Sequence, residues 1–289
     1  MSLPPGSVDL HTHTRHSDGL DSPAGLVAKC ARLGVRRLAV TDHDTLAGLP
    51  EARSAAEAHG VEVLTGIELS VQHEDFHDIH LLGYFFDPQD AALNACLARL
   101  QEGRTRRGLE ILRRVNERLA ELGLPPLSED CVRQRGGVMT RPHLARALVD
   151  EGRCRDHGEA FRDYLVPCNV PKAALPLAEG IRLITQAGGV CSMAHPGILS
   201  NDPNVLDPLL ADARVVGLAG LEVYHRAHHP SDIRFFEATA RRHGLAATGG
   251  SDYHGHPNGA VLGEIAPGHP VPAAVLDRLR QVAGGRGQP

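Results

Sequence analysis

Aromatic side chains are scarce in this chain of 289 residues. Tryptophan is absent, and Phe, Trp and Tyr together make up only 3% of the sequence. Hydrophobic residues nevertheless account for 42% of it, so aliphatic side chains must fill the interior. This length and composition allow a sizeable core, either in one large α/β domain or in a barrel with an insertion.

Long apolar segments and paired cysteines are also missing. No apolar stretch has the length of a transmembrane helix, and the N-terminus lacks the charged start and apolar run of a signal peptide. The six cysteines are scattered, with no C-x-x-C spacing that would indicate a structural zinc site. We therefore expect a cytoplasmic protein with reduced thiols and no membrane partner.

The chain has no excess of positive charge and almost no lysine. Its net charge of -5 argues against a protein that binds long duplex nucleic acid through its overall charge. Lys29 and Lys172 are the only lysines, and every other cation is arginine. This bias has two interpretations: a general mutational preference for arginine codons, or planar charged groups that bind phosphate.

Short apolar segments that end in His, Asp or Glu are the strongest positive signal. Residues 8–10 precede one such group, and residues 38–40 precede another. Runs of this kind are typical of buried parallel strands, whose carboxyl ends lie along one edge of a sheet. We therefore expect the polar residues after these strands to converge on a metal site. The nine candidate ligands are His11, His13, Asp18, His43, Glu68, His80, His195, Asp252 and His254.

The types and spacing of these ligands indicate hydrolytic metal chemistry. On an extended segment His11 and His13 face the same side, although an H-x-H pair alone is weak evidence. Taken singly, His80 is more typical of an ordinary core or surface histidine. Histidine and carboxylate ligands without thiolate suit Mn, Fe or Zn. Nine ligands are too many for one ion and fit two or three, which can generate hydroxide and clamp phosphate oxygens.

The distribution of predicted elements divides the chain into two parts. Strands and helices alternate over the first 86 residues, with a helix at 23–33, which favours right-handed crossovers and a parallel sheet or barrel. Residues 88–188 show little strand signal, and 102–122 form the clearest helix. After residue 188 the chain again contains predicted strands that are followed by candidate metal ligands. We therefore interpret 1–87 and 189–289 as one domain and 88–188 as a helical insertion covering the active site.

Arginines in the insertion are candidates for phosphate binding. Arg104 and Arg107 lie three residues apart on the long predicted helix, and Arg141 and His143 lie where another helix begins. A helix N-terminus offers free backbone N–H groups to an anion. The alternative for Arg104 and Arg107 is a solvated helix face, on which arginines pair with glutamates of the same helix.

The motifs, taken in order, resemble those of the PHP (polymerase and histidinol phosphatase) family. The matching stretches are His11-Thr12-His13, Asp18-Gly19, Thr41-Asp42-His43-Asp44, Gly66-Ile67-Glu68, His80, Ala194-His195-Pro196-Gly197 and Gly250-Ser251-Asp252-Tyr253-His254. The resemblance implies a distorted seven-stranded β/α barrel, with a helical insertion after the fourth strand and a trinuclear metal cluster. It also implies three ligand groups: His11, His13, Glu68 and Asp252; Glu68, His80 and His195; and Asp18, His43 and His254.

The insertion resembles that of a stand-alone nucleotide phosphoesterase branch of this family. Members of that branch remove the 3′-phosphate of nucleoside 3′,5′-bisphosphates, and some trim short RNA from its 5′ end. The resemblance implies a metal-dependent phosphoesterase for small nucleotides or short oligonucleotides. Arg104, Arg107 and Arg141 would bind substrate phosphate, with His143 in the same matching stretch. Ile198 departs from the family pattern, because relatives often carry arginine at this position.

Two questions stay open from the sequence. With a metal-bridging hydroxide as nucleophile, Asp44 or His225 could shuttle protons, although Asp44 could equally be the N-cap of the helix that follows it. The alternatives to a nucleotide phosphatase are a histidinol-phosphate phosphatase or other small phosphomonoesterase, and a non-catalytic PHP accessory module. Activity and metal content separate these alternatives.

Overall fold

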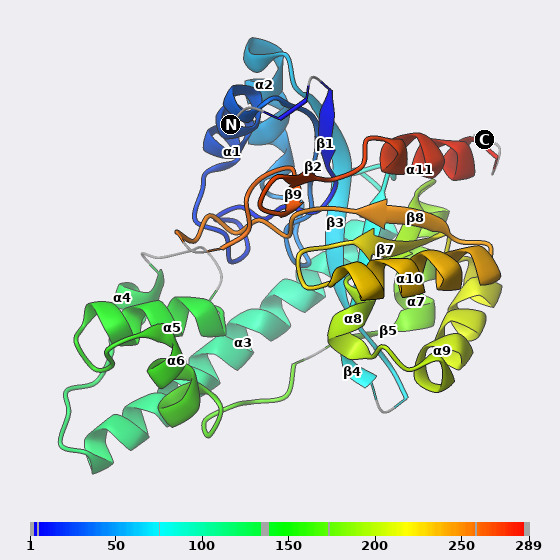
Figure 1. Ribbon diagram of the computed structural model, residues 1–289. Helices are drawn as coiled ribbons and strands as arrows, with labels where there is room; N and C mark the ends of the chain where they lie inside the picture. Colours follow the sequence, from blue (N-terminus) through cyan, green and yellow to red (C-terminus); the bar gives the residue numbers. More distant parts are fainter. Residues whose placement is uncertain are drawn as a thin grey trace.

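The computed structural model describes residues 3–4, 6–74, 76–133, 139–172, 174–257 and 259–285. Its centre is an eight-stranded sheet in the order β1-β2-β3-β4-β6-β7-β8, with β5 paired to β3 (Figure 1). A separate two-stranded sheet contains β9 and β10. The strands are β1 (Ser7–Asp9), β2 (Val35–Val40), β3 (Glu62–His73), β4 (Phe76–Tyr84), β5 (Leu175–Pro176), β6 (Val190–Met193), β7 (Gly220–Tyr224), β8 (Ala246–Gly249), β9 (Glu264–Ala266) and β10 (His269–Pro270).

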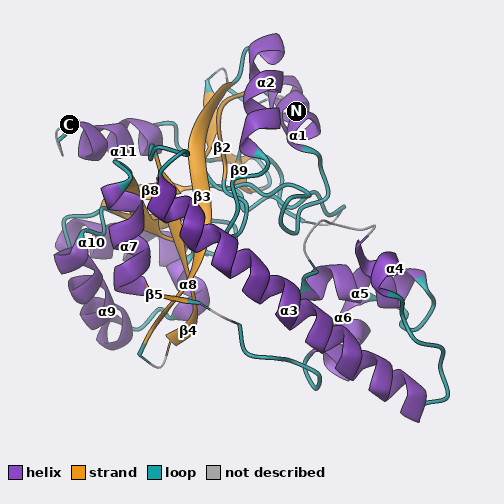
Figure 2. Ribbon diagram, turned by 180° about the vertical axis from the view of Figure 1, so that it is seen from behind, coloured by secondary structure: helices purple, strands orange, loops and turns teal. Residues whose placement is uncertain are grey.

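Helices surround this sheet and form a separate group beside it (Figures 1 and 2). In the described ranges, no helix combines the length and apolar character needed to cross a membrane. The helices are α1 (Pro23–Leu33), α2 (Leu49–His59), α3 (Ala91–Glu121), α4 (Glu129–Arg133), α5 (Arg141–Asp150), α6 (His157–Ala160), the π-helical η1 (Phe161–Leu165), α7 (Leu177–Gln186), α8 (Pro196–Leu199), α9 (Pro203–Val216), α10 (Pro230–Arg242) and α11 (Ala274–Gly284).

The predicted α/β class is confirmed, whereas a closed barrel remains a prediction. Most strand pairs are parallel, but β4 is antiparallel to both of its neighbours. No ladder joins β8 to β1 among the described residues. A single parallel bridge between Thr12 and Tyr253 joins the segments that follow these two strands. The ends of the sheet therefore meet beyond the strands, where several predicted ligands lie.

Local sequence signals explain where the first helix begins and ends. The Ser22 side chain accepts a hydrogen bond from the Gly25 N–H, and Pro23 occupies the first turn. Gly34 then ends the helix in the left-handed region, with a φ of 93°. The predicted helix at 23–33 is confirmed. The buried face of α1 packs with β2 and α2, which fixes the strand that leads to His43.

The long helix α3 connects two hydrophobic cores. Leu93 and Leu100, in its first half, belong to the core beneath the sheet. Ile111 and Val115, in its second half, belong to a separate core that also includes residues of α5 and η1. Figure 2 shows α3 running from the sheet to the group formed by α4, α5 and α6. The helical group thus has its own core but shares one helix with the main body.

Part of the predicted insertion belongs structurally to the main sheet. β5 pairs with β3, and α7 packs against β3, β4 and β6. Ile181 and Ile184 of α7 lie fully buried in the core beneath the sheet. The division at residues 88 and 188 remains a prediction, and the separate helical core contains residues between Ile111 and Cys168.

Candidate metal centre

All nine predicted ligands lie in one region of the molecule. They come from the segments after β1, β2, β6 and β8, and from within β3 and β4. Glu68 and His80 were expected at strand ends, but both lie inside strands. β3 and β4 pair from Gly66–Tyr84 to His73–Phe76, and this long antiparallel pair carries both strands past the site. The structure therefore brings the nine predicted residues together, but the strand-end rule fails for Glu68 and His80.

Glu68 is the centre of this arrangement. Its side chain is 1% exposed, and five imidazoles approach its two carboxylate oxygens. One oxygen faces three rings and the other faces two. The distances are 3.3 Å from His11 Nε2, 3.2 Å from His13 Nε2 and 3.0 Å from His43 Nδ1 to Oε2, and 2.8 Å from His80 Nδ1 and 3.2 Å from His195 Nε2 to Oε1.

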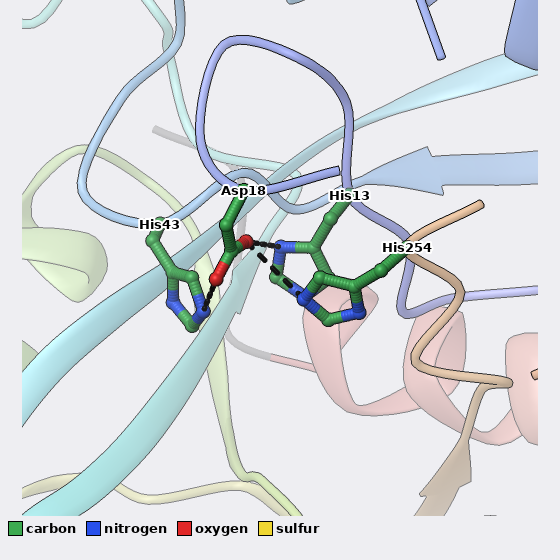
Figure 3. A group of neighbouring side chains, drawn as sticks. All are labelled: His13, Asp18, His43 and His254. Atoms are coloured by element: carbon green, nitrogen blue, oxygen red, sulfur yellow. Dashed lines mark ion pairs between the residues drawn. The ribbon is translucent and has the colours of Figure 1, made fainter. Parts of the chain in front are cut away.

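Asp18 lies among three histidines on one side of the centre, two of which also approach Glu68, as Figure 3 shows. His254 Nε2 lies 3.2 Å from Asp18 Oδ1, and His13 Nδ1 lies 3.9 Å from the same oxygen. His43 Nε2 is 3.7 Å from Asp18 Oδ2. One possible ligand atom from each of these four residues lies within 4.8 Å of the others, close enough to hold one ion.

Asp252 forms a further group with the first two histidines. Its Oδ1 lies 3.5 Å from His11 Nε2 and 3.2 Å from His13 Nε2. The backbone of Asp252 is in the left-handed region, with a φ of 55°, and its N–H donates to the carbonyl of His11 at 2.9 Å. This conformation costs energy for a residue with a side chain, and such strain is typical of functional sites.

Several ligand atoms at this centre are buried without a hydrogen bond. A buried polar atom left in this state costs about 1–3 kcal/mol, so a group of them indicates a missing binding partner. The donor set of imidazole and carboxylate suits divalent ions, and these residues could hold them. Among the described residues, the atoms at the centre without a hydrogen bond are His11 Nε2, His13 Nε2, Asp18 Oδ1, His43 Nδ1, Glu68 Oε2, His80 Nδ1 and His225 Nε2.

The electrostatics of the centre favour ionised carboxylates. Burial alone would raise the pKa of Glu68, but His43, His80 and His11 outweigh it and hold the pKa well below the usual value. Burial likewise opposes a low pKa at Asp18, where His43 and His254 lower it well below normal. The carboxylates therefore carry negative charge at neutral pH, as a cation site requires.

The imidazoles differ in their protonation. Burial lowers the pKa of both His43 and His195, which favours the neutral form that coordinates metal. Burial also acts to lower the pKa of His13, but Asp252 and Glu68 outweigh it and raise the pKa to about 10. A metal ion bound by His13 would displace a proton from this imidazole.

Glu222 is a site residue that the sequence analysis missed. Its Oε1 lies 2.9 Å from His11 Nδ1, and its Oε2 accepts a hydrogen bond from the His195 backbone N–H at 2.7 Å. The side chain is fully buried in β7. A carboxylate on the second nitrogen of a metal-binding imidazole fixes its orientation and tautomer. The available signal was a charged residue within the apolar run at 220–223.

Asp44 forms a buried ion pair with Arg104. Arg104 Nε donates to Asp44 Oδ2 at 2.6 Å, and the Ser70 N–H donates to Asp44 Oδ1 at 2.7 Å. Burial raises the pKa of Asp44, but Arg104 and Lys172 outweigh this effect and the pKa is lowered. An ionised, paired Asp44 positions Arg104, and its role as a proton shuttle remains a prediction. The N-cap alternative is wrong, because α2 begins after Gly48.

Four arginines of α3 fall into two groups. Arg113 and Arg114 pair with Glu110, and Arg113 also pairs with Glu117, as the solvated-face interpretation expected. Arg104 and Arg107 do not follow that pattern, since Arg104 pairs with Asp44 as described above. Arg107 Nε instead donates to the carbonyl of Val170 at 2.7 Å.

Two of the predicted phosphate-binding arginines act on the third, Arg107. Burial, together with nearby Arg141 and Arg104, lowers the pKa of Arg107 to about 10. Repulsion of this kind indicates a place that would gain from an anion. Arg141 begins α5, where its guanidinium lies 5.9 Å from the centroid of the Phe161 ring. The substrate-binding role of these residues remains a prediction.

Two further residues extend the region around the centre. His143 is buried, and its Nδ1 lies 3.1 Å from Oγ1 of the N-cap Thr140. This contact supports the start of α5, and the predicted substrate contact of His143 stays untested. Lys172 was not predicted as a site residue, yet its Nζ lies 3.1 Å from His80 Nε2. Its only signal in the sequence was the rarity of lysine.

Comparisons with known proteins agree with this geometry. Residues 9–123 match the PHP domain family. The chain is 35% identical over 253 residues to a 3′,5′-nucleoside bisphosphate phosphatase of Chromobacterium violaceum, covering 86% of this chain and 87% of that protein. It is 33% identical over 252 residues to a 5′-3′ exoribonuclease of Haemophilus influenzae, covering 85% and 89% of the two chains.

Solved structures show the same relationship. A protein of Bifidobacterium adolescentis, described as a metal-dependent phosphoesterase, superposes with a TM-score of 0.82 at 32% identity, covering 96% of this chain and 97% of that chain. An amidohydrolase from Chromobacterium violaceum, solved with sulfate and without metal, gives a TM-score of 0.79 at 33% identity, covering 94% and 97%. The chain therefore belongs to the PHP family and is an enzyme of its metal-dependent phosphoesterase class.

Proposed function

We propose that this enzyme removes the 3′-phosphate from nucleoside 3′,5′-bisphosphates. The observation that carries the proposal is that a cluster of metal-ligand side chains and an arginine lie in one region. Imidazoles and carboxylates surround Glu68, where divalent ions fit, and Arg104 reaches the same region from α3. Arg141 and Arg104 both act to lower the pKa of Arg107, and we refer to these three residues as the cationic group. A substrate with two phosphates would use both the metal ligands and the arginines.

The relatives support this choice of substrate. The similar Chromobacterium violaceum enzyme is named for nucleoside bisphosphates, and the solved structure from that organism carries sulfate, an anion of phosphate shape. The similarity to the Haemophilus influenzae exoribonuclease favours the 5′ end of short RNA as a second substrate. By contrast, the match to a DNA polymerase of Oceanobacillus iheyensis covers only 22% of this chain, which disfavours the accessory-module alternative.

The chemistry divides between the ions and the side chains. Two or three bound Mn ions would provide hydroxide at neutral pH and neutralise phosphate charge. Arg104 would stabilise the charge that develops on the phosphoryl oxygens, and Asp44 keeps its guanidinium oriented. Glu222 keeps the His11 ring and the His195 backbone in place. None of these roles requires a nucleophile from the protein.

Phosphate release tests the proposal. We expect Mn-loaded enzyme to convert adenosine 3′,5′-bisphosphate to adenosine 5′-phosphate and inorganic phosphate, and to act more slowly on histidinol phosphate. Absence of turnover after metal content has been verified would reject the bisphosphate. A higher kcat/KM for histidinol phosphate would instead favour the histidinol-phosphate alternative. Because none of the six cysteines, all of them described, forms a disulfide, we also propose a reducing, cytoplasmic location.

A further inference from the structure

A pocket of about 410 Å³ lies beside the metal centre, between β4 and α8. Two predicted ligands, His80 and His195, form part of its lining. The same two imidazoles approach Glu68 Oε1, at 2.8 Å and 3.2 Å. The pocket and the centre therefore share two side chains, so the pocket lies next to a phosphate held at the centre.

The walls of this pocket are largely apolar. Phe76 and Met193 contribute from β4 and β6, and Ile198 and Leu199 contribute from α8. Ile198 is 63% exposed and leaves apolar surface in water at the edge of this pocket. Apolar surface at a concave site that also contains a few polar groups is typical of a ligand pocket. The feature indicates a ligand group that is itself apolar or aromatic.

In the part of the chain that the structure describes, the pocket lining lacks the lysines and arginines that commonly bind phosphate. Among the described residues that line it, none is lysine or arginine, and Asp78 is the only carboxylate. Lys172 Nζ lies 3.5 Å from Asp78 Oδ1 and compensates its charge. The cationic group of Arg104, Arg107 and Arg141 does not line the pocket. A second phosphate is therefore better placed at the arginines.

We propose that this pocket binds the nucleobase of the substrate, with Ile198 as the residue that sets the preference for a nucleotide over a sugar phosphate. The inference rests on the proposed function, because it assigns the two ends of a nucleotide to two sides of the centre. A flat, uncharged heteroaromatic ring suits apolar walls with a few polar groups at the rim. The phosphate that is not cleaved then faces the arginines.

Equilibrium binding tests the assignment without depending on turnover. Calorimetry on the Mn-loaded protein would compare adenosine 5′-phosphate with ribose 5-phosphate, which lacks the base. We expect the nucleotide to bind about tenfold more tightly to the wild type. Ile198→Ser and Ile198→Asp should lose most of this preference while keeping their affinity for ribose 5-phosphate within about threefold. Val215→Ser is a matched control, because Val215 is an exposed aliphatic residue of α9 that does not line the pocket.

The outcomes separate this inference from the proposed function. Equal wild-type affinity for the two ligands, or a preference that survives in both Ile198 variants, overturns the pocket assignment. If phosphate is still released from the bisphosphate in that case, the proposed function is supported and only the pocket assignment is rejected. A base preference that Ile198→Ser abolishes supports the pocket even if the bisphosphate is not hydrolysed, and the reaction would then have to be reassigned.

Discussion

Glu222 shows how a single buried carboxylate organises two elements of the site. Its two oxygens contact the His11 ring and the His195 backbone, which follow different strands. Burial alone would raise its pKa, but the nearby His11 outweighs burial and the pKa is lowered. The group is therefore an acceptor that orients its neighbours rather than a proton donor at neutral pH.

We expect Glu222→Gln to weaken both metal binding and catalysis. The amide keeps the size of the side chain but loses the charge, so the His11 ring is less firmly held. The expected loss in metal affinity and in kcat is roughly 10–100-fold. Elemental analysis and steady-state kinetics measure the two effects. Glu117→Gln, on the exposed face of α3, is the control. Unchanged metal affinity in Glu222→Gln would contradict the positioning role.

Among the helices, α3 has the largest influence on the site, because it supplies Arg104 and Arg107 and supports the segment before Arg141. Gly108 of this helix lies directly against that segment. A Cβ at residue 108 would meet the backbone oxygen of Met139 at 2.4 Å, which no real contact allows. The close approach of α3 to residues 139–141 therefore depends on glycine at this position.

We expect Gly108→Ala to raise the KM for the bisphosphate several-fold while leaving metal content unchanged. The added methyl group must push the Met139 backbone away and displace Arg141 from the cationic group. Thermal unfolding should show a loss of about 1–3 kcal/mol in stability. Glu117→Ala is the control on the same helix, at an exposed position. A changed metal content with an unaltered KM would show that the helix acts on the centre by another route.

Over the whole molecule, the metal centre joins segments that are far apart in the chain. Ligands that follow β1, β2, β6 and β8 meet those of β3 and β4 around Glu68. The centre contains more imidazole and carboxylate groups than their own contacts satisfy. A cation that binds the folded state alone stabilises it by mass action.

Metal should therefore stabilise the fold in a pH-dependent way. We expect saturating Mn to raise the melting temperature by roughly 5 °C or more over metal-free protein.

The pH dependence of this effect follows from His13. Its pKa is raised to about 10, so the stability that protonated His13 contributes to the metal-free protein is complete below the ordinary pKa of 6.5 and is lost as pH rises toward about 10. Because Mn must displace this proton, its stabilising effect should be larger at about pH 8 than at about pH 6. Scanning calorimetry with and without chelator measures both. A shift that is independent of pH would argue against proton displacement.

The candidate ligands were predictable because their signal is local. An apolar run followed by histidine or a carboxylate is visible in the order of residues, and parallel strands bring such ends together without further information. The α/β class and the helix at 23–33, with Ser22 and Gly34 at its ends, have the same local origin. Nothing local revealed that β4 is antiparallel, which is why Glu68 and His80 lie inside strands.

The sequence by itself determined the residue types, their spacing and therefore the chemistry that the site can perform. Only the tertiary structure decided which groups became partners. Glu222 lies 211 residues from His11, and Arg104 lies 60 residues from Asp44. Their contacts depend on how strands and α3 pack, and side-chain spacing within one segment carries no information about that. The pocket next to Ile198 also depends on tertiary packing. Its walls come from β4 and α8, and the pairing of β4 with β6 brings them together because α8 follows β6.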